Sequence, residues 1–150
     1  MTQSQRRETL IRYLLQERPE YTGVSLPTGE EEQRRMLRSL MNLRPPAPIS
    51  EEFLLVQDVY LRERLEERGV AQLGNLRPVQ PGLYLWQGDI TILEVGAIVN
   101  AANSGMTGCY IPCHGCIDNA IHTYAGVQLR LECAGLMVKQ GRPEPTGQAK

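Results

Sequence analysis

The sequence predicts a mixed α/β protein with a helical N-terminal part followed by an incomplete sheet-and-helix part. Apolar residues recur at helical spacing within residues 1–80, as at Leu10, Leu14 and Leu37. The pattern changes after Pro81, where short apolar stretches flanked by glycine indicate strands. Only two such stretches occur, and two strands do not make a stable sheet. We therefore expect a sheet that these residues begin but do not complete.

Start and stop signals delimit the helices expected in the N-terminal part. Thr28 and Glu31 have the spacing of a capping box, so Thr28 is the expected N-cap of the second helix. The proline-rich stretch after Arg44 must end that helix, because proline removes a backbone donor. Ser50 predicts the N-cap of a third helix, and Gly69 predicts its end.

Two strands are expected in the second part of the chain, over residues 83–87 and 96–100. The second is entirely apolar up to Asn100, which predicts burial on both faces, as in a parallel sheet. Residues 90–93 between them are expected to form a short turn or helix. The loop after Asn100 would lie at the carboxyl end of a strand, where open α/β sheets bind ligands.

Composition limits the class of function. The chain has 150 residues, of which 41% are hydrophobic and 22% charged, so it has enough apolar residues for a core and is not disordered. Its net charge of -1 and the absence of a long basic run argue against nucleic-acid binding. No apolar run is long enough for a membrane span, and the polar N-terminus has no signal-peptide core. We therefore expect a cytoplasmic protein.

A compact group of metal-ligand side chains lies in the last third of the chain. Cys109, His114 and Cys116 supply two thiols and an imidazole, which are the ligands that zinc prefers, and Cys113 is a candidate fourth ligand. Three protein ligands would leave one coordination position for water or substrate, as in catalytic zinc sites. Asp118 follows two residues later and predicts a carboxylate beside the ion.

Other interpretations of these cysteines stay open. Free cysteines are often small buried hydrophobes without chemistry. In the cytoplasm, however, clustered cysteines more often hold a metal than form disulfides. If Cys113 were a fourth ligand, the site would be closed, and the zinc would only stabilise a helical interaction domain.

A helix is expected directly after the cysteine cluster. Apolar residues repeat every four positions from Ile117, which predicts one helix to about Val138 before Gly141 ends it. Asp118 in the first turn is favourable against the helix dipole. The free N–H groups of that turn could also hold an anion such as a phosphate.

Several of these stretches resemble one family. Residues 88–91 and 97–103 resemble the opening of a macrodomain, an α/β/α module that binds ADP-ribose. Residues 109–122 resemble one branch specifically, the zinc-dependent macrodomains of bacteria and fungi, which are protein-ADP-ribose hydrolases. The resemblance implies a three-layer α/β/α sandwich, of which residues 81–150 are the first part. Residues 1–80 would be the helical N-terminal extension of that branch.

The same resemblance implies how the nucleotide would be held. Asp89 matches the acid that receives the adenine amino group, and the main-chain N–H of Ile90 would contact the ring. Asn103 and Asp118 match residues at the distal ribose, where they would be the catalytic side chains. Asn103 would fix the sugar, and Asp118 would position the nucleophile or act as base. The main-chain groups implied in the diphosphate and ribose contacts are those of Cys116 and Ile117.

The implied metal ligands agree with the set found from residue types alone. Cys109, His114 and Cys116 match the zinc ligands of the branch, whereas Cys113 falls at a position that is not a ligand. Zn²⁺ is therefore the expected cofactor.

The implied function is zinc-dependent removal of mono-ADP-ribose from modified protein side chains. The expected partners are ADP-ribose and a mono-ADP-ribosylated protein, with no nucleic acid and no membrane. The remaining strands of the family, with a second glycine-rich phosphate loop, would follow Lys150, so the chain is expected to be truncated within the domain. The alternative is a module that binds ADP-ribose and zinc, or an inactive truncated remnant, without turnover.

Overall fold

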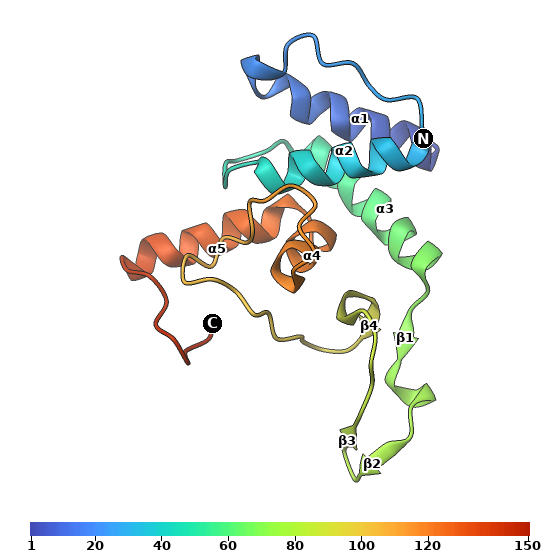
Figure 1. The fold of residues 1–150 in the computed structure, drawn as a ribbon, viewed down its shortest axis with the longest axis vertical. Helices are drawn as coiled ribbons and strands as arrows, with labels where there is room; N and C mark the ends of the chain where they lie inside the picture. The colour runs from blue at the N-terminus through green and yellow to red at the C-terminus, as the bar shows by residue number, and fades with distance from the viewer.

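The computed structural model describes residues 1–150 and groups its helices in one body, from which a thin strand region extends at one end (Figure 1). Its helices are α1 (Gln3–Gln16), α2 (Glu30–Leu43), α3 (Glu51–Arg68), α4 (Ile117–Tyr124) and α5 (Val127–Gln140). Its strands are β1 (Ala71–Gln72), β2 (Pro78–Gln80), β3 (Leu83–Tyr84) and β4 (Leu93–Glu94). Short 3₁₀ turns, η1 to η3, cover Pro19–Tyr21, Leu73–Asn75 and Ile90–Ile92.

The hydrophobic core lies between α1, α2 and α3, with the start of α5 packed against it. Most of its members come from the apolar stripes that the sequence predicts on the first three helices. The buried core residues are Leu10, Ile11, Leu14, Leu37, Leu40, Met41, Phe53, Tyr60 and Val127. Because Val127 belongs to this cluster, the C-terminal helices pack on the N-terminal ones and are not a separate body.

Helix boundaries follow the sequence signals in most places. The hydroxyl of Ser50 accepts a hydrogen bond from the N–H of Phe53, and Gly69 ends α3, as predicted. Thr28 is not the N-cap of α2, so that prediction is wrong: the helix begins at Glu30 after Gly29, without a side-chain cap. Three successive glutamates occupy the first turn instead, where their negative charges interact favourably with the positive end of the helix dipole.

The strand region forms two separate two-stranded sheets. β1 pairs with β4 in parallel, and β2 pairs with β3 in an antiparallel hairpin. The strand expected over residues 83–87 is thus limited to β3, and η3 confirms the short helical turn expected before β4. The N-terminal helices end at Arg68, so they are shorter than the helical part expected over residues 1–80. Residues 71–80 hold β1, η2 and β2 instead.

The expected strand over residues 96–100 is absent, and its predicted burial is wrong. The side chain of Val99 is 88% exposed and that of Ile98 is also exposed. No other strand lies alongside this segment, so its backbone has no ladder partner and its apolar side chains have no sheet to pack into. The fold is nonetheless of the expected mixed α/β class, with five helices and short strands, in line with the incomplete sheet that the sequence predicts.

The expected single helix from Ile117 to Val138 is two helices. Gly126 breaks it with a backbone φ of +84°, which favours glycine. A Cβ at this position would lie 2.4 Å from the amide nitrogen of Gln57 on α3. The chain turns here because α5 must pack against α3, a tertiary requirement that the four-residue repeat does not reveal.

None of the five helices combines the length and apolarity needed to cross a membrane.

Candidate functional site

The structure brings together the three side chains predicted to bind zinc. The ligand atoms of Cys109, His114 and Cys116 all lie within 4.8 Å of one another. Cys109 Sγ is 3.6 Å from His114 Nδ1. In a tetrahedral zinc site, a thiolate and an imidazole ligand lie about 3.6 Å apart. Two sulfur atoms and one ring nitrogen at this spacing therefore fit zinc, and the exposed His114 leaves one side of the cluster open to solvent.

Cys113 does not belong to this cluster. Its Sγ lies 3.3 Å from the hydroxyl of Ser39 and 3.4 Å from the main-chain oxygen of Arg35, both on α2. Its own N–H donates to Asn42 Oδ1 at 3.0 Å. These contacts point the thiol toward α2, and the closed four-ligand site considered above is not formed.

The ligand loop, residues 109–116, ends where α4 begins. Cys116 is the N-cap of α4, and its Sγ accepts a hydrogen bond from the N–H of Asn119 at 3.4 Å. A thiolate is the metal-binding form of cysteine, and this donor would stabilise its negative charge. The same sequence position therefore ends the loop, caps the helix and carries a candidate ligand atom.

Gly108 allows the loop to pass against α4. Its φ is +84°, and a Cβ there would lie 2.7 Å from the ring of His122. Two independent constraints, backbone conformation and space, thus require glycine just before the first ligand.

The side chain of Arg130 on α5 hydrogen-bonds both the chain at the start of the ligand loop and the end of α2. Its buried guanidinium stacks over the ring of Tyr110 at 4.2 Å and donates to the main-chain oxygen of Thr107 at 2.7 Å. Burial lowers the pKa of Arg130, although the group stays a donor to many oxygens. The other main-chain oxygens that it reaches belong to Met41, Asn42, Arg44 and Cys109.

Asp118 lies in a buried polar cluster beside the ligand loop. Its Oδ1 accepts a hydrogen bond from Asn100 Nδ2 at 2.8 Å and lies 3.6 Å from His122 Nε2. Burial lowers the pKa of His122; attraction to Asp118 opposes this change, and repulsion by Arg130 adds to it. The Nδ1 atom of His122 and the Oδ1 atom of Asn100 are buried without a hydrogen-bond partner.

The side chain of Asn103 hydrogen-bonds main-chain groups of its own loop. Its Oδ1 accepts from the N–H of Gly105 at 2.9 Å, and its Nδ2 donates to the main-chain oxygen of Gly108 at 3.2 Å. This is an Asx turn, a common use of asparagine. The side chain is exposed, but both of its polar atoms have partners within the loop.

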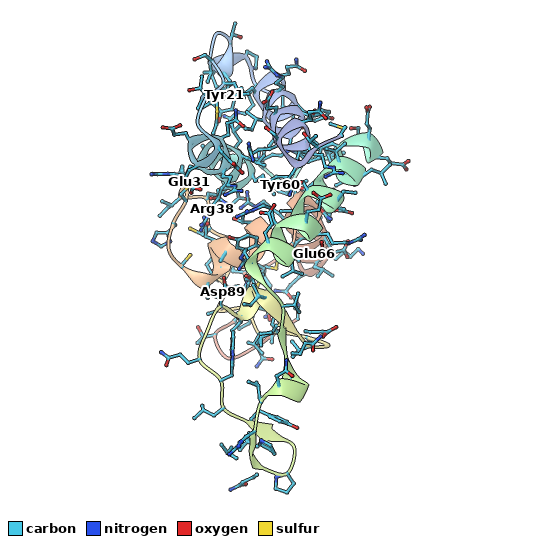
Figure 2. All side chains as sticks on the ribbon, turned by 90° about the vertical axis from the view of Figure 1, so that its right-hand side faces the viewer. Tyr21, Glu31, Arg38, Tyr60, Glu66 and Asp89 are labelled. Atoms are coloured by element: carbon cyan, nitrogen blue, oxygen red, sulfur yellow. The ribbon has the colours of Figure 1, made fainter.

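Asp89 and Ile90 lie at η3, where the structure joins them to α3. Asp89 Oδ1 accepts from the N–H and the hydroxyl of Thr91, and its Oδ2 pairs with Arg68 of α3. Burial acts to raise the pKa of Asp89, but the bonds from Thr91 and the charge of Arg68 outweigh it and hold that pKa below its usual value. Asp89 lies below the α2 and α3 side chains labelled in Figure 2.

The sequence did not reveal several residues that surround the candidate site. Asn100, Arg38 and Arg130 contact Asp118, Asn119 or the ligand loop, yet the sequence assigned a role to none of them. Asn100 carried a weak signal, because it is the polar residue that ends an apolar run. The two arginines carried none, since charged residues on helices are usually solvated.

Comparisons with known proteins agree with the predicted fold class. Residues 99–150 match the Macro domain family. The chain is 59% identical over 154 residues to a "Protein-ADP-ribose hydrolase" of Treponema medium, covering all of this chain and 59% of the relative. It is 45% identical to a protein of the same name from Staphylococcus aureus (strain Mu50 / ATCC 700699), covering 97% of this chain and 54% of the relative.

A fungal protein is also similar. A "Probable bifunctional ADP-ribose hydrolase/ADP-ribosyltransferase" of Fusarium oxysporum f. sp. cubense is 40% identical over 124 residues, covering 75% of this chain and 21% of the relative. The chain thus spans little more than half the length of the two bacterial relatives. Its fold is mixed α/β with the sequence of a macro domain over residues 99–150, and protein-ADP-ribose hydrolases are among its relatives.

Proposed function

We propose that this chain forms the metal-binding and part of the ADP-ribose-binding region of a zinc-dependent protein-ADP-ribose hydrolase. The substrate would be a protein carrying mono-ADP-ribose on a side chain. The observation that carries the proposal is the gathering of Cys109, His114 and Cys116 within 4.8 Å, next to the buried carboxylate of Asp118. The names of the bacterial relatives support the reaction class.

Cys109, His114 and Cys116 would hold the ion. A zinc ion with an open position supplies Lewis-acid polarisation of an oxygen atom and activation of water. Because His114 is exposed while both cysteines are partly buried, the open side of the cluster faces solvent. A ribose could approach from that side.

Asp118 would act on the distal ribose or on the attacking water. Asn100 donates to one of its oxygens and orients the carboxylate. His122 lies 3.6 Å from the same oxygen, and burial favours its neutral form. A carboxylate held in this way can accept a proton from a nucleophile within hydrogen-bond reach. Asp89 and the main-chain N–H of Ile90 would receive the adenine, and Arg68 would have to share or release Asp89.

A second function is favoured by one observation. Both polar atoms of the Asn103 side chain already have partners in their loop, so Asn103 would have to change partners to hold a ribose. This favours the alternative in which the chain holds zinc but does not turn over an ADP-ribosylated protein.

Release of ADP-ribose from a mono-ADP-ribosylated protein tests the proposal. The purified chain would be incubated with the modified protein, and free ADP-ribose would be quantified by liquid chromatography. We expect release that stops on treatment with a chelator and returns on addition of zinc. Asp118→Asn and Cys116→Ser should lose release, whereas Cys133→Ser is the matched control. Zinc and ADP-ribose binding without release would favour the binding module, and absence of zinc binding would refute both functions.

A further inference from the structure

Arg38 on α2 contacts the end of the ligand loop and the first turns of α4. Its guanidinium donates to Asn119 Oδ1 from Nη2 at 2.7 Å and from Nε at 3.1 Å. The same Nη2 donates to the main-chain oxygen of His114 at 2.9 Å. Figure 2 shows Arg38 on α2 beside the orange segment that carries the loop and α4. One side chain of the N-terminal helices thus binds the main chain of a candidate zinc ligand.

Asn119 extends this connection across the loop. It is fully buried, and its Nδ2 donates to the main-chain oxygen of Ile111 at 3.0 Å. Its N–H donates to Cys116 Sγ at 3.4 Å. Arg38 therefore fixes the side chain of the residue that contacts both the middle of the loop and one of the two candidate sulfur ligands.

The placement of His114 should depend on the hydrogen bond from Arg38 more than the placement of the two cysteines does. Its side chain is exposed, so neighbouring side chains constrain its ring little. The main chain from which the ring extends is held by Arg38 through its oxygen. Groups that orient metal ligands through hydrogen bonds commonly change metal affinity by 10- to 100-fold when they are removed.

We propose that Arg38 is a positioning residue for the zinc ligands, so that α2 tunes the metal affinity of the ligand loop. This inference rests on the ligand set of the proposed function. It adds a role for the N-terminal helices, which carry none of the candidate ligands. Arg38 touches neither the ion nor the substrate in this proposal; it acts through His114 and Asn119.

Arg35 provides a matched control. It lies one turn before Arg38 on α2, is exposed, and its side chain makes no hydrogen bond or ion pair. Its main-chain oxygen accepts from Cys113 Sγ, a contact that substitution of the side chain leaves in place. Replacing either arginine by alanine removes one positive charge from the same helix.

Zinc affinity of the full chain tests the proposal. Zn²⁺ would be titrated in competition with a chromophoric chelator, and the melting temperature of the metal-free protein would be measured in parallel. We expect Arg38→Ala to bind Zn²⁺ about tenfold more weakly or worse, in line with lost ligand orientation. Arg35→Ala should stay within about twofold of the unsubstituted chain, because it removes charge but no contact with the loop. Equal affinities of the two variants would overturn the proposal.

Arg38→Lys separates positioning from folding. Lysine keeps the charge and the aliphatic stem but has one ammonium group, which cannot span both acceptors as the guanidinium fork does. We expect a melting temperature close to that of the unsubstituted chain and a several-fold loss of Zn²⁺ affinity. With Co²⁺ as a spectroscopic probe, the thiolate absorption should need a correspondingly higher cobalt concentration.

The results that would refute the proposed function differ from those that would refute the role of Arg38. If the unsubstituted chain binds no Zn²⁺, the ligand set and the proposed function are wrong, and this inference is refuted with them. If it binds Zn²⁺ and Arg38→Lys binds equally well, only the role of Arg38 is refuted. A weaker affinity of Arg38→Ala that merely follows loss of metal-free stability, with Arg38→Lys unchanged, refutes positioning as well.

Discussion

The side chain of Gln57 accepts a hydrogen bond on Oε1 from the main-chain N–H of Val127 at 3.0 Å. Gln57 lies in the middle of α3 and is fully buried, and Val127 is the first residue of α5. The free N–H at the start of a helix needs a partner, and here a side chain from a distant helix supplies it. The N-terminal helices are therefore hydrogen-bonded to the C-terminal helix α5 as well as packed against it.

Replacing Gln57 by leucine should destabilise the protein by about 1–3 kcal/mol, because the buried N–H of Val127 would lose its partner. The measurement is urea unfolding followed by circular dichroism. Leu55→Gln, at a position 69% exposed on the same helix, is the control and should change the free energy of unfolding by no more than about 0.5 kcal/mol. Similar stability of both variants would show that this hydrogen bond contributes little.

Replacing Gly108 by alanine should cost about 2 kcal/mol or more, because the new methyl group would meet the His122 ring in a backbone conformation that alanine adopts poorly. Thermal unfolding of the metal-free protein measures the effect. Gly115→Ala is a matched control in the same region, since a Cβ there would contact no atom within 4 Å. If the two substitutions shift the melting temperature equally, the close approach of Gly108 to His122 is not a constraint.

Replacing Cys116 by serine should abolish zinc binding while leaving the protein folded. Serine is a good N-cap, so the N–H of Asn119 keeps an acceptor, but the thiolate ligand is lost. Zinc bound per chain, measured by elemental analysis after dialysis, should fall to background. Cys133→Ser should retain zinc, because Cys133 lies outside the cluster and burial raises the pKa of its thiol. Retention of zinc by the Cys116 variant would contradict the ligand assignment.

Stability of the metal-free protein should fall as the pH is lowered below about 6.5, partly because of His122. Above that pH both folded and unfolded histidine are neutral. Below it the unfolded chain gains a proton that the buried ring resists, since burial lowers the folded pKa, so unfolding becomes more favourable until the pH passes the folded pKa. Urea midpoints between pH 7 and pH 5, with a chelator present, measure this slope.

His122→Phe keeps an aromatic ring and should reduce that slope. His114→Gln, which removes the only other histidine, is the control for loss of an imidazole. Identical slopes in all three proteins would mean that burial of His122 does not contribute to acid sensitivity.

The sequence predicted the parts of the fold that depend on local signals. The core stripes of α1 to α3, the Ser50 cap and the Gly69 stop are confirmed, because caps and apolar spacing act over a few residues. The break at Gly126 and the failure of the expected strand over residues 96–100 depend on distant contacts. The first requires α3 alongside, and the second would need neighbouring strands that do not lie there.

The candidate site likewise has a part that the sequence predicted and a part that it did not. Cys109, His114 and Cys116 are at most seven positions apart, so their spacing alone indicated that they could meet, and the structure brings them together. Arg38 and Arg130 reach the loop from α2 and α5 through main-chain oxygens. Main-chain acceptors leave no residue signature, and such supporting contacts are therefore invisible in a single sequence.

The three candidate zinc ligands lie in one contiguous piece of chain, and its contacts on α2 are synthesised before it. The segment from Cys109 to Cys116 closes on itself, and short closures have a small entropic penalty. The α2 residues that contact this segment emerge from the ribosome before it does. The α4 and α5 residues that contact it emerge shortly afterwards. On the proposed ligand set, a nascent polypeptide that has emerged as far as α5 should therefore already be able to chelate zinc through this segment.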